Sequence, residues 1–302
     1  MVDDSVNFTF GHNSYTTSDV VVLMLKPTGG DYIDGLLGTS YFMQNVLKID
    51  YFNQYIENHS SIDSVCLDGY SSIPMQIVGH SPMVELNIKI NDTLTMKSSF
   101  MVDIGSPTTT ISSSFVSKLN LDKQIDRKAR YYTKYGGIGG DSAGYDFISD
   151  SVSLAGFILQ NATISYSIDT AGIFFEDDFG GILGGNILDR FDLVFDFINS
   201  KLHLKPNATF CKPFIYDRLG FYFNDRTSTL GGWIVSSLTE KSEAEKNGLQ
   251  IDDLIVKVNG VSTDEIPYIK QKHHFDDMKN VSLEVVRHDS LVTICFDLIP
   301  LL

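Results

Sequence analysis

Residues 100–112, FMVDIGSPTTTIS, are the stretch on which the interpretation of this chain depends. An apolar run predicts a strand that ends at Asp103, and Gly105 and Ser106 follow it in a turn. A carboxylate at such a turn can lie at an interface between domains, where a neighbouring hydroxyl can hydrogen-bond it. The pattern D-x-G-S also occurs in ordinary turns, because Asp and Gly are common turn residues. Its meaning therefore depends on the motifs around it.

Two glycine-bearing motifs follow the Asp103 turn. Residues 135–142, YGGIGGDS, predict a hairpin tip that can bend over a ligand at little steric cost. Residues 182–188, ILGGNIL, place two apolar residues and a glycine before a short helix. Alternating apolar residues recur along the chain, as in residues 84–96 with a turn at 91–92, and they predict a mostly β protein. The residues of the hairpin tip are Gly136, Gly137, Ile138, Gly139 and Gly140.

The order of these three motifs resembles one lobe of the aspartic proteases, and more closely the retropepsin-like branch, over about residues 82–204. In that family each lobe contributes one Asp, and the two carboxylates share a proton and activate a water that attacks the peptide carbonyl. The resemblance implies that Asp103 is catalytic and that Ser106 hydrogen-bonds it. It also implies that residues 136–140 form a flap that closes on substrate.

An internal repeat extends this resemblance toward the start of the chain. Residues 35–56 align without gaps on residues 181–202 at an offset of 146, with six identities in 22 pairs. We therefore expect residues 1–60 to be the C-terminal part of a first lobe. The alternative is two unrelated segments that both form strand, short helix and strand. The identical pairs are Gly35/Gly181, Leu37/Leu183, Gly38/Gly184, Leu47/Leu193, Asp50/Asp196 and Asn53/Asn199.

Two departures from the family pattern concern the catalytic centre. Ile104 stands where the family usually has a threonine, whose hydroxyl ties the two catalytic loops together. Subtracting 146 from position 103 places the equivalent Asp of the first lobe before Met1, and residues 1–60 contain no D-T-G. Three interpretations stay open: the chain is a fragment of a longer protein, Asp103 pairs with its copy in a homodimer, or no dyad forms. In the last case Asp103 is a turn or capping residue.

The C-terminal block resembles a PDZ domain. Residues 242–261, SEAEKNGLQIDDLIVKVNGV, predict a helix, a glycine cap and a strand–turn series. In such domains a loop offers backbone N–H groups to a chain-terminal carboxylate, which Arg218 could help attract, and the next strand adds the peptide as an extra strand. A helix expected at about residues 264–279 would supply the other wall of the groove. The loop residues implied are Leu219, Gly220 and Phe221.

Competing motifs have less support. Gly140-Asp141-Ser142-Ala143-Gly144 fits G-x-S-x-G, which would make Ser142 a nucleophile, but no histidine stands in the context of a general base. Residues 178–180 spell the kinase D-F-G without a catalytic loop H-R-D, and we interpret them as a turn before the next strand. The cysteines are widely spaced, and the adjacent His273 and His274 cannot share one helix face, so no metal site or cofactor is expected.

Charge and composition narrow the partners and the compartment. The chain of 302 residues has 23 Lys plus Arg against 38 Asp plus Glu, a formal charge of −15, which disfavours nucleic acid. The longest apolar run, residues 20–25, is too short to span a membrane, so no transmembrane segment is expected. The first residues lack the basic and apolar regions of a signal peptide. The compartment stays open, although the resemblance favours the periplasm or secretion.

These observations define the expected architecture. We expect a mainly β chain with pepsin- or retropepsin-like β-barrel lobes, the first of them partial, followed by a PDZ domain, itself an α+β, partly open β-barrel. The expected domains are residues 1–60, 61–205 and 206–302.

They also define the expected function, an aspartic endopeptidase-family protein that cleaves extended polypeptide and holds a C-terminal or internal peptide in the PDZ groove. The homodimer stays possible. The rivals are a non-catalytic peptide-binding protein and a serine protease with a PDZ domain.

Overall fold

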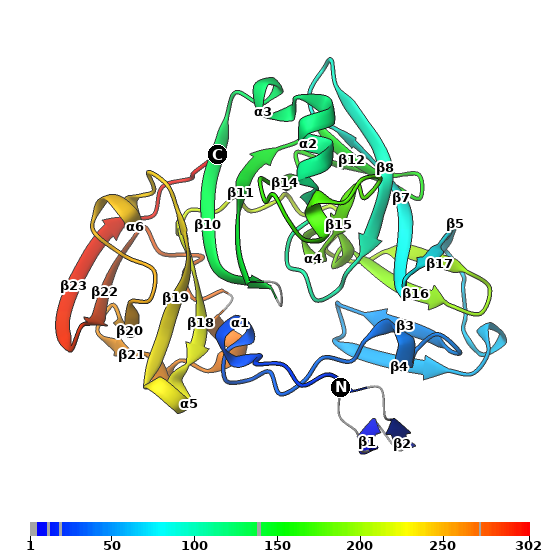
Figure 1. The fold of residues 1–302 in the computed structure, drawn as a ribbon, viewed down its shortest axis with the longest axis horizontal. Helices are drawn as coiled ribbons and strands as arrows, with labels where there is room; N and C mark the ends of the chain where they lie inside the picture. Colours follow the sequence, from blue (N-terminus) through cyan, green and yellow to red (C-terminus); the bar gives the residue numbers. More distant parts are fainter. Residues whose placement is uncertain (1–4, 11–12, 18–19, 138–139, 272) are drawn as a thin grey trace.

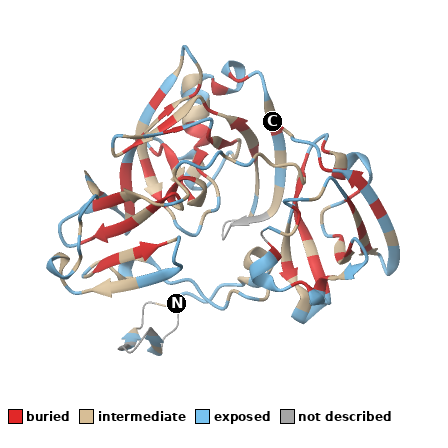
Figure 2. Cartoon of the chain, turned by 180° about the vertical axis from the view of Figure 1, so that it is seen from behind, coloured by how far each residue is buried: buried red, intermediate tan, exposed pale blue. Residues whose placement is uncertain are grey.

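The computed structural model describes residues 5–10, 13–17, 20–137, 140–271 and 273–302 (Figure 1). Most of the chain forms two bodies, which we call the larger lobe (residues 46–206) and the smaller lobe (residues 221–297). Each lobe has its own core of buried apolar side chains, and Figure 2 shows these cores as buried positions along the strands. Before the larger lobe lie β1 (Val6–Phe10), β2 (Asn13–Thr17), α1 (Lys26–Gly29) and the 3₁₀ turn η1 (Thr39–Tyr41).

The larger lobe is built almost entirely of strands. Its short helices are α2 (Ser113–Leu119), α3 (Leu121–Gln124) and α4 (Gly185–Leu188), with 3₁₀ turns η2 (Ile62–Ser64) and η3 (Ile173–Phe175). Its strands are β3 (Val46–Asp50), β4 (Tyr55–His59), β5 (Ser71–Pro74), β6 (Gln76–Val78), β7 (Ser81–Lys89), β8 (Thr95–Val102), β9 (Thr110–Ile111), β10 (Lys128–Gly137), β11 (Gly140–Ile148), β12 (Ser151–Leu154), β13 (Phe157–Gln160), β14 (Thr163–Ser167), β15 (Gly181–Leu183), β16 (Phe191–Asp196) and β17 (Lys201–Pro206).

A five-stranded sheet of the larger lobe contains the later part of each segment of the expected repeat. Its strand order is β4-β3-β16-β17-β5, and β3 is antiparallel to β16. Lys48 lies opposite Val194, which is also its equivalent at the offset of 146. The pairing of β3 with β16 is therefore two-fold symmetric about this residue pair.

The turns after these two strands have the same local structure. The carboxylate of Asp50 accepts hydrogen bonds from the backbone N and Nδ2 of Asn53, at 2.7 and 2.9 Å. Asp196 accepts the same two bonds from Asn199, at 3.0 and 2.7 Å. The next residue has a positive φ in both turns, 59° in one and 53° in the other. A short polar side chain that holds its own turn explains why the D-x-x-N spacing recurs.

The second large sheet brings together segments that are distant in sequence. Strand β15 lies between β8, to which it is parallel, and β9, to which it is antiparallel. The hairpin expected in residues 84–96 is confirmed as β7 and β8, and the side chain of Asn91 holds its turn by accepting the backbone N–H of Thr93 and Leu94, both at 3.0 Å. The C-terminal end of β8 thereby meets the end of β15.

The same sheet continues from the larger lobe into the smaller one. Strand β10 pairs with β11 on one side and, through residues 131–133, with β19 of the smaller lobe on the other. The hydroxyl of Thr133 donates to Ser237 Oγ at 2.8 Å, and Lys134 Nζ lies 2.6 Å from the carboxylate of Asp252. The two lobes are thus joined edge to edge by backbone hydrogen bonds.

The smaller lobe wraps its strands around an aromatic core. The indole of Trp233 is fully buried and stacks on Phe223 at 4.3 Å between ring centroids. Its elements are β18 (Phe221–Arg226), α5 (Thr227–Leu230), β19 (Gly232–Thr239), α6 (Glu243–Lys246), β20 (Leu254–Val258), β21 (Val261–Ser262), η4 (Thr263–Glu265), α7 (Tyr268–Gln271), β22 (Asn280–Arg287) and β23 (Ser290–Asp297).

The helix expected over residues 264–279 is wrong in extent. Among the residues of this range that the structure describes, the helical elements are η4 and the single turn α7, with Pro267 between them. Proline lacks an N–H donor and clashes with the preceding turn, so it interrupts a continuous helix. Nowhere among the described residues is a helix both long and apolar enough to cross a membrane.

Candidate active site and peptide groove

The loop after β8 positions Asp103. Its backbone N–H donates to the carbonyl of Leu183 at the end of β15, at 3.1 Å. Its carboxylate oxygen Oδ1 accepts the N–H of Gly105 at 2.8 Å, and a Cβ added to Gly105 would lie 3.2 Å from that oxygen. Asp103 is half-buried, whereas the side chain of Ile104 is 46% exposed. The loop therefore presents one carboxylate at an open face of the larger lobe.

Ser106 does not make the bond expected of it. Its hydroxyl donates to the carbonyl of Thr108 at 2.9 Å. A hydroxyl has a single proton to donate, so Ser106 cannot at the same time donate to the Asp103 carboxylate. Its carbonyl accepts the N–H of Gly185 at 2.7 Å, which ties the loop to the start of α4. Ser106 thus shapes the loop instead of binding the carboxylate.

Two residues that the sequence interpretation missed hold the other side of this loop. The buried hydroxyl of Thr109 accepts the N–H of Gly184 at 3.1 Å and donates to Asn186 Oδ1 at 2.8 Å. The amide of Asn186 in turn donates to the carbonyl of Thr163 at 2.7 Å. The only sequence signals were the T-T-T run after the Asp103 turn and the Asn within ILGGNIL.

Tyr51, in the turn after β3, lies close enough to the Asp103 loop to be affected by its charge. Burial, with the charges of Asp189 and Asp103, raises the pKa of Tyr51 to about 12. Its hydroxyl oxygen is buried and has no hydrogen-bond partner in the part of the chain that the structure describes. The phenol therefore stays protonated and available as a donor at neutral and acidic pH.

The expected flap corresponds to the tip of the hairpin β10–β11. Gly137 lies opposite Gly140, and the phenol of Tyr132 hydrogen-bonds Asp141 across the hairpin. Ile138 and Gly139 lie outside the described residues. Figure 1 shows the end of β10, the start of β11 and the C-terminal end of β8 on the same lower side of the larger lobe. The hairpin is in place, whereas its closure on a substrate stays a prediction.

The backbone of the expected carboxylate-binding loop is already engaged. The N–H groups of Leu219 and Gly220 both point at Asp217 Oδ1, at 2.8 and 3.4 Å. Phe221 begins β18 with its ring in the core of the smaller lobe. The guanidinium of Arg218 donates to the carbonyl of Asp276 at 2.6 Å. An internal carboxylate thus occupies the amides that the resemblance assigns to a peptide terminus.

Asp217 also lies near a second half-buried carboxylate, that of Asp146, across the seam between the lobes. Burial, with the charge of Asp217, raises the pKa of Asp146 on β11 to about 6, although a hydrogen bond from Ser165 Oγ at 2.5 Å opposes this shift. Burial likewise raises the pKa of Asp217, although the backbone N–H groups of its own loop that donate to the carboxylate oppose this rise.

Asp146 predicts a pH dependence of stability. A carboxyl whose pKa rises on folding is protonated more readily in the folded state, so the free energy of unfolding should fall as pH increases from about 4 to above 6. The loss attributable to Asp146 is on the order of 2 to 3 kcal/mol. Asp146→Asn should remove this loss, and thermal unfolding from pH 4.5 to 8 measures it. The exposed Asp68, replaced by Asn, is the control, and equal pH slopes in the Asp146 variant and the parent chain would contradict the prediction.

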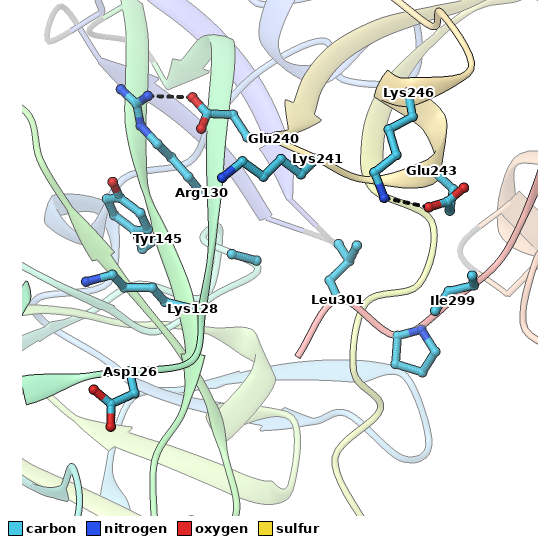
Figure 3. A pocket seen from close by; sticks show the side chains of 12 residues that line it. Asp126, Lys128, Arg130, Tyr145, Glu240, Lys241, Glu243, Lys246, Ile299 and Leu301 are labelled. Carbon is cyan, nitrogen blue, oxygen red and sulfur yellow. Dashed lines mark hydrogen bonds and ion pairs between the residues drawn. The ribbon is translucent and has the colours of Figure 1, made fainter.

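An open cleft of about 470 Å³ lies at the same seam, away from the Asp103 loop. Figure 3 shows two ion pairs within the cleft, Arg130 with Glu240 and Lys246 with Glu243, and two further lining residues of opposite charge, Asp126 and Lys241. Lys128, also on its wall, is paired with Asp122. The cleft therefore has little unbalanced charge to offer a ligand.

The G-x-S-x-G motif around Ser142 and the D-F-G sequence at residues 178–180 have structural roles. The hydroxyl of Ser142 donates to Asp169 Oδ2 at 2.7 Å, so its proton is directed at a carboxylate and not at a histidine base. Asp178 has a φ of 64° in the turn that leads into β15, as expected for residues 178–180. In the described part of the chain, no cluster of three or more His, Cys, Asp or Glu residues could hold a metal ion.

Comparison with known proteins agrees with this geometry. Residues 86–187 match a protein family described as aspartyl protease, and residues 213–286 match the PDZ domain family. The larger lobe is thus an aspartic-protease lobe, and the smaller lobe is a PDZ domain. Neither match covers half of the chain, so each describes one domain of the protein and not the whole chain. No curated protein matches the sequence.

Solved structures of two proteases are similar to parts of the chain. A retropepsin-like aspartic protease from Rickettsia conorii is 18% identical, with a TM-score of 0.31, over 45% of this chain and 91% of its own. An aspartic proteinase from Irpex lacteus is 12% identical, with a TM-score of 0.34, over 56% of this chain and 57% of its own.

Proposed function

We propose that this protein is an aspartic endopeptidase that cleaves extended polypeptide and captures it with its PDZ domain. The observation that carries the proposal is the Asp103 loop, in which β15 and Gly105 hold one carboxylate at an open face. In the proposed reaction a dyad of carboxylates shares one proton. The ionised carboxylate takes a proton from water as its oxygen bonds to the peptide carbonyl carbon, and the protonated one gives its proton to the carbonyl oxygen. Collapse of this intermediate breaks the C–N bond and protonates the leaving amine.

The second carboxylate of the dyad must come from outside the larger lobe. Residues 35–38 are the repeat equivalent of residues 181–184, but they form no strand, and Leu36 and Leu37 are 60% and 42% exposed. Leu183, the equivalent of Leu37, is fully buried between β8 and β9. This contrast supports a further Asp-bearing partner at the open face, and a second copy of the chain supplies one. We also propose the domain division 1–60, 61–205 and 206–302.

Two observations favour the second candidate, a peptide-binding protein without catalysis. The Asp103 carboxylate is bound by its own loop, and the threonine that would tie two catalytic loops together is replaced by the exposed Ile104. In this case substrate recognition by the PDZ groove would be the whole activity.

Sedimentation of the purified chain across a concentration series separates the two candidates. The same samples are assayed on an unfolded protein at mildly acidic pH, with and without a pepstatin-type inhibitor. The endopeptidase proposal expects inhibitable cleavage that rises with the dimer fraction. A monomer without cleavage at every concentration supports the binding protein, and cleavage that only a serine-directed reagent blocks would overturn both.

A further inference from the structure

Residues 26–32, KPTGGDY, lie on the PDZ domain although they precede it by almost 190 residues in sequence. We call them the N-terminal strap. Figure 1 shows α1, the first part of the strap, beside β18, and the two are in contact. None of the residues of α1 is buried, and Met24 just before it is 87% exposed. The strap is therefore attached through a small number of specific contacts, not through a core of its own.

The carboxylate of Asp31 is the main contact. It accepts hydrogen bonds from the backbone N of Thr229 at 2.9 Å, from the hydroxyl of Thr229 at 2.8 Å and from Arg226 Nε at 3.1 Å. The side chain of Asp31 is only 3% exposed. Burial alone would raise the pKa of Asp31, but the bonds from Thr229 and Arg226 outweigh it and lower the pKa. This is a built carboxylate site, because charge-assisted bonds satisfy a buried anion.

The strap backbone adds to the free edge of β18. The N–H of Asp31 donates to the carbonyl of Asp225 at 2.7 Å, and Asn224 Nδ2 donates to the carbonyl of Pro27 at 2.7 Å. Gly30 has a φ of 75°, and a Cβ there would lie 2.6 Å from the carbonyl oxygen of Asp225. Only glycine allows this approach. The strap thus places the backbone of Gly30 and Asp31 against the free edge of β18.

An aromatic contact also joins the strap to the PDZ domain. The ring of Tyr32 stacks on that of Tyr268 in α7, with 4.4 Å between centroids. Both rings remain about half exposed, at 52% and 48%. A cavity of about 130 Å³ beside the strap is lined by Pro27, by Lys134 of the flap strand β10 and by Arg226. The strap therefore lies between β18 and the base of the flap.

We propose that β18, Thr229 and Tyr268 form a binding site for internal peptides of the type Gly-Asp-aromatic, which the N-terminal strap fills in the free protein. The site is at the opposite end of β18 from Leu219 and Gly220, so its ligand needs no chain terminus. A polypeptide with the same chemistry displaces the strap and docks beside the flap. The inference deepens the PDZ part of the proposed function and rests on it.

The test uses a labelled peptide, LKPTGGDYI, acetylated and amidated so that it has no terminal charges. In the full chain the strap competes at a high effective concentration, and the peptide should bind weakly. Asp31→Ala removes the competitor's carboxylate and should tighten binding about tenfold or more. Tyr32→Ala, which alters only a half-exposed stacking contact, should give a smaller gain without risk to folding. The matched control is Asp34→Ala, an exposed acidic residue of the same segment, which should leave the affinity unchanged.

The specificity for the Asp carboxylate is checked by changing first the peptide and then the PDZ domain. A peptide with Asn in place of Asp should bind Asp31→Ala poorly, and adding Arg226→Gln to that variant should abolish the gain. Equal affinities in the parent chain, Asp31→Ala and Tyr32→Ala, with all three folded by circular dichroism, would overturn the inference. A parent chain that never cleaves polypeptide, while its variants bind the peptide as expected, would overturn only the catalytic proposal, so the two failures are distinguishable.

Discussion

Asp103→Asn is expected to reduce cleavage of unfolded polypeptide by about a thousandfold or more, because it replaces the group that takes a proton from the attacking water with one that cannot ionise. The fold should be retained, since an asparagine Oδ1 can still accept the N–H of Gly105 as Asp103 Oδ1 does. Turnover is measured at mildly acidic pH on a preparation whose dimer fraction matches that of the parent chain.

Asp178→Asn is the matched control for this variant. Asp178 is an exposed turn residue with a positive φ that asparagine also tolerates, and it lies just before β15. The control should cleave at the parental rate and Asp103→Asn should not. Unchanged cleavage in Asp103→Asn would exclude Asp103 from the chemistry, whereas PDZ peptide binding should be the same in all three proteins.

Gly184→Ala is expected to lower the melting temperature of the larger lobe by about 10 °C, which corresponds to about 3 kcal/mol of overpacking. A Cβ at this position would lie 2.1 Å from the carbonyl oxygen of Thr108 and 3.0 Å from that of Ser106. Both atoms belong to the backbone of the Asp103 loop, so they cannot rotate away. The variant should therefore lose cleavage as well as stability.

Gly38→Ala provides the comparison, because Gly38 is the repeat equivalent of Gly184. Both glycines have extended backbone angles that alanine adopts freely, with φ of −75° and −105°. Only Ser40 Oγ, at 3.8 Å, approaches a Cβ at position 38. The change should alter stability by no more than about 0.5 kcal/mol in the monomer. A large loss in Gly38→Ala, or none in Gly184→Ala, would contradict this account of the loop.

Local patterns predicted those parts of the fold that local contacts determine. The β7–β8 hairpin follows from alternation and an Asn-Asp turn. The pairs Asp50/Asp196 and Asn53/Asn199 are identities of the repeat, although the turns that they form were not predicted from it. The helix expected over residues 264–279 was wrong in extent although Pro267, which interrupts it, is visible in the sequence. The success and the error each depend on interactions within a few residues.

The details of the site were less predictable because they depend on distant partners. The carbonyl of Ser106 accepts the N–H of Gly185, which lies about 80 residues further along the chain, and no pattern near Ser106 indicates this contact. Asp217 and the carboxylate loop it occupies are adjacent in sequence, yet nothing in D-R-L-G distinguishes an internal acceptor from a peptide terminus. The contact between Asp31 and Thr229 spans nearly 200 residues.

The hydrogen bonds between β10 and β19 affect how this protein can be divided. A cut between the lobes would leave each half with strand residues whose N–H and C=O groups have lost their partners, and such bare edges recruit strands from other molecules. Separately expressed halves should therefore self-associate more than the intact chain. Recombination that exchanges one lobe must preserve the edge strand, β10 or β19, that pairs with the other lobe. The two lobes are therefore expected to be inherited as a unit.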